Sequence, residues 1–137
     1  MADINIASVA SEFGISLPRS YLQFLRRFPV VLTQPCISGR PDLGAPCDEW
    51  ALRDPKAIQE LNREFWDFWP EMEFNDKEKP FPRHRFLIGS LDGDLLAIST
   101  RSLTLFRVFI YKHEHGWWLP FAFSMWHFTR RLAARTQ

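Results

Sequence analysis

The sequence predicts an α+β domain with N-terminal helices, a small, mainly antiparallel sheet of about four to five strands, and a C-terminal helix packed on that sheet. Apolar residues recur with a helical period up to residue 68, whereas short β-type runs separated by turns begin at residue 85. The chain has 137 residues, of which 46% are hydrophobic and 15% aromatic. This length and composition suit one domain that covers residues 1–137.

Two helices are expected in the first 30 residues. The first covers residues 4–13, because its apolar residues recur at i, i+3, i+4 and i+7, and Gly14 supplies a stop. The second begins near Pro18, whose backbone angle suits a first helical turn, and it ends at Pro29. Each helix therefore has one apolar face for a core.

A third helix is expected after an irregular segment. Prolines and glycines punctuate residues 33–48, and residues 49–53 suit a short strand. Asp54 followed by Pro55 is the order in which many helices begin. The apolar face of this helix consists of Ile58, Leu61, Phe65 and Phe68. Trp66 falls outside that face.

The remaining elements are the strands and the closing helix. Strands are expected over residues 85–90, 95–100, 106–112 and 117–119. Gly93 lies in the hairpin turn between the first two strands, and Gly116 turns the third strand into the fourth. A final helix over residues 124–134 places Met125, Phe128 and Leu132 toward the sheet.

Charge and composition exclude several classes of protein. Seventeen basic and sixteen acidic residues give a net charge of +1, so no overall field attracts nucleic acid or an anionic membrane. The longest apolar stretch, residues 116–123, is far shorter than the roughly 20 residues of a membrane span. The first residues lack the features of a secretion signal, and Cys36 and Cys47 suit free thiols in a reducing compartment. We therefore expect a cytoplasmic protein that is a monomer or a weak homodimer.

Residues typical of catalysis or metal binding are few. His113 and His115 would share a strand face, but no third ligand is close to them in sequence. Asp92 and Asp94 resemble paired carboxylates, yet in a hairpin such residues usually form the turn. Residues 101–111 interleave arginine and aromatic residues, which a half-buried strand explains better than binding of single-stranded nucleic acid. We expect no catalytic residue, no metal and no cofactor.

The candidate partner surface combines tryptophans with an acidic segment. Residues 64–78 contain six acidic residues and one basic residue, a pattern that also fits a solvated loop. Trp117 and Trp118 point to opposite faces of a strand, so at least one is exposed if the sheet is covered on one side. Core packing is the alternative for each tryptophan. The predicted partner-binding residues are Trp66, Trp69, Glu71, Glu73, Asp76, Trp117 and Trp118.

Three segments resemble the SUKH superfamily, which includes a fungal regulator of cell-wall synthesis and many bacterial immunity proteins. Residues 12–25 resemble its opening, in which a Leu-Pro pair starts a helix reading Pro-x-x-Tyr-x-x-Phe-Leu. Residues 86–98 are similar to its strand, Gly/Asp turn and strand. Residues 108–114 and, after a short gap, residues 123–128 are similar to its aromatic strand and terminal helix. The resemblance implies a protein without catalytic residues that binds a cognate toxin, often a nuclease, and occludes it.

An acidic, aromatic-rimmed patch would suit the basic groove of a nuclease. Two other functions remain open at this point. One is a regulatory or scaffold module of the same fold that binds a host protein. The other is a small enzyme that uses His113, His115 or Asp92, which would require these side chains to converge in one pocket.

Overall fold

The computed structural model describes residues 5–33, 51–68, 84–91, 93–101, 104–112 and 116–134. Three helices precede the sheet: α1 (Ile6–Glu12), α2 (Arg19–Arg26) and α3 (Pro55–Phe68), with a short 3-10 helix, η1 (Val30–Thr33), between the last two. The strands and closing helix are β1 (Arg85–Leu91), β2 (Asp94–Ser99), β3 (Val108–Lys112), β4 (Trp117–Ala122) and α4 (Met125–Ala133). The predicted α+β class, antiparallel sheet and C-terminal helix are confirmed.

The four strands form one antiparallel sheet in the order β1-β2-β3-β4. The turn between β1 and β2 contains Gly93, whose φ of 89° is a left-handed conformation that glycine adopts without strain. The register shifts between Leu87 and Gly89 in β1, and again between Val108 and Phe109 where β3 pairs with β4. Such irregularities increase the local twist of a sheet.

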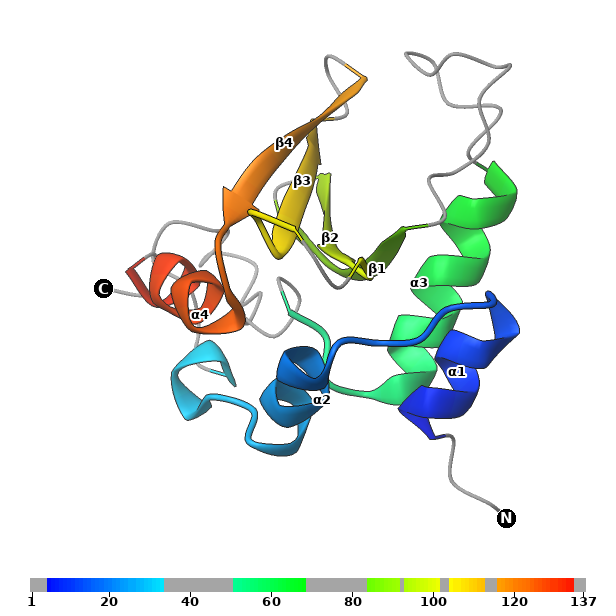
Figure 1. Ribbon diagram of the computed structural model, residues 1–137, viewed down its shortest axis with the longest axis horizontal. Coiled ribbons are helices and arrows are strands. Elements are labelled where there is room, and N and C mark those ends of the chain that lie inside the picture. The colour runs from blue at the N-terminus through cyan, green and yellow to red at the C-terminus, as the bar shows by residue number, and fades with distance from the viewer. Residues whose placement is uncertain are drawn as a thin grey trace, which may run out of the picture.

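The helices cover both faces of the sheet unequally (Figure 1). The larger core cluster lies between one sheet face and α1, α2 and α4, and its sheet residues include Phe86, Ile88, Leu96, Ile98, Val108 and Ile110. A smaller cluster on the opposite face contains Leu87, Leu95, Ala97 and Tyr111. Leu61, Phe65 and Trp66 of α3 pack against that smaller cluster, and α3 runs beside β1.

The ends of α1 follow the sequence signals. The side chain of Asn5 accepts a hydrogen bond from a backbone N–H of the first turn. At the other end, Gly14 has φ 68° and donates to the Ser11 carbonyl, while Ile15 donates to the Ala10 carbonyl, both at 3.0 Å. This pair of bonds is a Schellman motif, so the predicted stop at Gly14 is confirmed.

The strand expected over residues 49–53 is not formed in its described part, residues 51–53. A single backbone hydrogen bond joins this segment to the sheet, from the Leu52 N–H to the Ile88 carbonyl of β1 at 2.8 Å. The Asn62 side chain of α3 bonds the N–H and carbonyl of the adjacent Leu87, so this part of the β1 edge is not open to a paired strand. In the described part of the chain, no helix is long and apolar enough to span a bilayer.

Candidate protein-binding surface

One edge of the sheet is closed by the protein itself. Asn62 of α3 is fully buried, and its side-chain amide bonds to the outer edge of β1. Its Oδ1 accepts the Leu87 N–H and its Nδ2 donates to the Leu87 carbonyl, each at 2.9 Å. Together with the bond from Leu52 to Ile88, these contacts satisfy backbone groups that an open edge would offer to another strand.

The other edge, β4, has no further strand beside it among the described residues. Pro120 interrupts this edge and has no N–H to donate, which disfavours pairing with a strand of another chain. At this edge, a partner protein would instead be recognised through side chains. Large apolar side chains are exposed along β4 and at the start of α4: Trp117 by 54%, Leu119 by 42%, Phe123 by 56% and Trp126 by 68%.

We refer to Trp117, Leu119, Phe123 and Trp126 as the β4–α4 aromatic surface. Two of its members are held in place by neighbours. Phe123 stacks between Phe106, at 4.5 Å between ring centroids, and His127, at 5.3 Å. The Arg130 guanidinium lies 4.8 Å from the centroid of the Trp126 ring. Exposed aromatic side chains with restricted positions are typical anchors of protein interfaces.

The structure separates the predicted tryptophans. Trp117 is exposed, whereas Trp118 is half-buried on the opposite face, 5.2 Å from the Tyr111 ring, as strand alternation requires. Trp66 is half-buried, lies 4.9 Å from the Phe13 ring and packs against both core clusters. Trp66 and Trp118 therefore both pack against the smaller cluster, whereas Trp117 lies on the other face of its strand. The other predicted partner-binding residues, Trp69, Glu71, Glu73 and Asp76, lie outside the described residues.

Most of the residues considered as catalytic or metal-binding candidates also lie outside the described residues: Cys36, Cys47, Asp92, His113 and His115. Asp94 is described and is buried at the start of β2. Its Oδ2 lies 3.1 Å from the Lys112 Nζ of the neighbouring β3, so it forms a cross-strand ion pair. In the described ranges, no three histidine, cysteine or acidic side chains gather into a group that would hold a metal ion.

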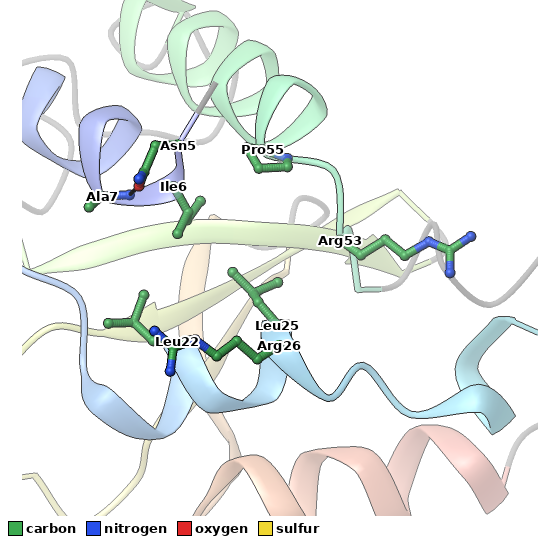
Figure 2. A pocket seen from close by; sticks show the side chains of 8 residues that line it. All are labelled: Asn5, Ile6, Ala7, Leu22, Leu25, Arg26, Arg53 and Pro55. Atoms are coloured by element: carbon green, nitrogen blue, oxygen red, sulfur yellow. Dashed lines mark hydrogen bonds between the residues drawn. The ribbon is translucent and has the colours of Figure 1, made fainter. Parts of the chain in front are cut away.

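A groove of about 480 Å³ opens between α1, α2 and the start of α3 (Figure 2). Its apolar lining includes Ile6, Leu25 and Pro55, one from each of these regions, and Arg26 and Arg53 lie at its rim. Among the described residues that line it, there is no acidic residue, histidine or cysteine. It therefore suits binding of an apolar group rather than acid–base or nucleophilic chemistry.

Sequence patterns did not reveal this groove because its walls come from residues about 50 positions apart, which only the tertiary fold brings together. The β4–α4 aromatic surface was found in part. Strand alternation identified Trp117, but Phe123 and Trp126 flank the helix start and carry no periodic signal of exposure.

The model of the SMI1 / KNR4 family (SUKH-1) matches residues 2–131. The chain belongs to this family. No curated protein and no solved structure matches the chain. The family match extends from α1 into α4 and includes the groove and the β4–α4 aromatic surface.

In this SUKH-1 protein, the first segment that resembles the superfamily runs from the end of α1 through most of α2, and the second is the β1–β2 hairpin. The third consists of β3 and the start of α4. Within them, Tyr21, Phe86 and Phe128 are fully buried, which gives these motif residues a role in packing. Membership of the family indicates interaction with another protein in general terms, without identifying the partner.

Proposed function

We propose that this SUKH-1 protein is an immunity protein that binds one cognate bacterial toxin and neutralises it by occlusion, with no catalytic step of its own. The observation that carries the proposal is the family match over residues 2–131. The exposed side chains at the open edge of the sheet support it, because they provide a surface on which a partner protein can be anchored.

To occlude a toxin, the protein needs a binding interface of the size that is usual for specific protein complexes. Specific complexes bury about 800 Å² on each partner, and a few aromatic or arginine anchors near the centre supply most of the binding energy. Trp117 and Trp126 are the largest exposed apolar side chains of the β4–α4 aromatic surface. The toxin would be inactive because its substrate cannot reach an active site that this surface covers.

The test is capture of the partner followed by an activity assay. The tagged protein is purified from its native source, and a protein that co-purifies at equal stoichiometry is identified and expressed. We expect that protein to be toxic to cells and to lose its activity when the SUKH-1 protein is added. The activity assays include a nuclease assay, because the acidic segment, residues 64–78, would suit the basic groove of a nuclease.

Variants of the aromatic surface make the test specific. Trp117→Ala combined with Trp126→Ala is expected to weaken toxin binding at least about thirtyfold, since interface anchors each contribute about 2 kcal/mol or more. Lys56→Ala is the matched control, because Lys56 is exposed on α3 and lies outside the surface. Equal binding by the double variant and the control would exclude this surface as the toxin-binding site.

A regulatory or scaffold module is the alternative within the same family. The groove between α1, α2 and α3 favours it, because that groove is separate in sequence and structure from β4 and offers a second binding place. A scaffold would capture a resident cellular protein that is harmless when expressed alone. If the SUKH-1 protein rescues cells from a co-purified toxin, the result favours the immunity function over the scaffold function.

A further inference from the structure

Three arginines gather where α2 begins and β2 ends. Arg19, Arg101 and Arg107 line one groove of about 410 Å³, between the start of α2 and the segment that follows β2. The Arg85 guanidinium of β1 lies outside this groove, over the rings of Phe109 and Trp118. We call Arg19, Arg101 and Arg107 the arginine surface.

One of these guanidinium groups is held in a fixed position. Arg107 donates through Nη1 to the carbonyls of Ser99, at 2.8 Å, and Arg101, at 3.0 Å. Fixed arginines lose less conformational entropy on binding than mobile ones do.

The charge of this surface is not neutralised by the described part of the chain. The described carboxylates that form close contacts do so elsewhere: Glu12 pairs with Arg63, Asp94 pairs with Lys112, and Asp54 accepts the Lys56 N–H. The guanidinium groups of Arg19, Arg101 and Arg107 therefore offer positive charge to an anion at this groove.

We propose that the arginine surface binds carboxylate groups on an acidic face of the partner protein, an inference that rests on the proposed function for the existence of that partner. Arginine offers a planar fork of donors that matches a carboxylate in a two-bond geometry. Phosphate matches the fork too, but nucleic-acid-binding domains are strongly basic, whereas this chain has a net charge of +1 and a pI of about 7.9. We therefore favour carboxylates of a protein over phosphates of a nucleic acid as the groups that the arginine surface binds.

The test uses a poly-glutamate peptide as a carboxylate probe, with binding followed by fluorescence anisotropy at low ionic strength. Arg19 and Arg101 are exposed, so the double variant Arg19→Glu, Arg101→Glu is expected to fold. We expect it to bind the peptide at least about tenfold more weakly than the wild type, because two favourable charge contacts become repulsive. Arg27→Glu, at the exposed end of α2, is the matched control and is expected to retain binding within about twofold.

Three results would overturn the proposal. They are failure of the wild-type protein to bind poly-glutamate, equal losses in the double variant and in Arg27→Glu, and tighter binding of inorganic polyphosphate of matched charge. The last result would assign the surface to phosphate groups, and hence to nucleic acid, instead of to a protein.

A second readout comes from His84, whose pKa is lowered by burial and by the charges of Arg85 and Arg101. A carboxylate bound beside Arg101 raises the pKa of His84, because it offsets the charge of that guanidinium group. NMR titration of the His84 imidazole with and without poly-glutamate is expected to show this rise, and no change would contradict the proposal. His84→Gln identifies the resonance.

The outcome is separable from the proposed function. If a captured toxin binds the Arg19→Glu, Arg101→Glu variant as tightly as the wild type, the immunity function stands and the arginine surface is not its interface. If the wild-type protein captures no toxin, the proposed function fails, while the poly-glutamate and His84 measurements still decide whether the surface binds carboxylates.

Discussion

The side chain of Asn62 makes both backbone hydrogen bonds of Leu87, one to its N–H and one to its carbonyl, at 2.9 Å each. An amide side chain has the same donor and acceptor as a peptide group, so Asn62 replaces a missing neighbouring strand. Its Nδ2 also donates to the Ile58 carbonyl one turn earlier in α3, which fixes its orientation. Of the two sheet edges, β1 is thereby closed, and β4 is the edge with exposed aromatic side chains.

Replacement of Asn62 is expected to destabilise the protein. In Asn62→Leu, the buried N–H and carbonyl of Leu87 lose their partners, and each unsatisfied group costs about 1–3 kcal/mol. We expect the free energy of unfolding to fall by about 2–5 kcal/mol, measured by urea denaturation. Glu60→Gln on the exposed side of the same helix is the control, with an expected change below about 0.5 kcal/mol. A similar loss in both variants would contradict the role of the Asn62 amide.

The first turn of α4 contains an exposed and a buried aromatic residue with different expected contributions to stability. Trp126 is 68% exposed, while Phe128 is fully buried, with its ring 5.9 Å from those of Phe24 and Phe121. Phe128→Ala is expected to cost about 3–5 kcal/mol and Trp126→Ala less than about 1 kcal/mol, measured by urea unfolding. A large loss in Trp126→Ala would show that Trp126 serves folding, which would weaken its assignment to a partner surface.

Tyr21 is a fully buried residue whose hydroxyl has no hydrogen-bond partner within the described ranges. Its ring packs against Phe24 and Phe86, with centroids 6.2 and 6.5 Å away. Tyr21→Phe retains the ring and removes the desolvated hydroxyl, so we expect an increase of up to about 1 kcal/mol in unfolding free energy. Burial also raises the pKa of Tyr21 above its ordinary value, so its ultraviolet titration should require unfolding. A Tyr21→Phe protein that is less stable than the wild type would show that the Tyr21 hydroxyl stabilises the fold, which would contradict this prediction.

Local sequence signals predicted the ends of several elements closely, because these signals act within one turn of the chain. The final helix was expected over residues 124–134 and covers Met125–Ala133, where the Ser124 side chain accepts the His127 N–H at 3.1 Å. Gly14 likewise ended α1 as expected. Capping groups and left-handed glycines depend on neighbouring residues alone, so they can be identified without knowledge of the fold.

Sequence patterns could not predict the features that depend on two segments far apart in the chain. A helical stripe assumes one covered face, but α3 lies beside the sheet and contacts both core clusters, which explains why Trp66 outside the stripe is half-buried. A polar residue such as Asn62 in a helix is usually exposed, and only the position of β1 makes it buried. The arginine surface combines residues from α2 and the β2–β3 segment, so charge counts along the chain could not reveal it.

The stability of the protein is expected to decrease as the pH falls below the ordinary histidine value of 6.5, in part because of His84. Burial and the charges of Arg85 and Arg101 lower the pKa of His84 in the folded protein. Between this lowered pKa and 6.5, the unfolded chain binds a proton at this position that the folded protein does not, so stability falls as the pH falls and the contribution levels off below the folded-state pKa. Urea denaturation of the wild type and of His84→Gln at a series of pH values measures this contribution. We expect the variant to lose less stability across that window, and Arg101→Gln, which raises the pKa of His84, to lie between them. Identical pH profiles for the wild type and His84→Gln would show that folding does not lower the pKa of His84.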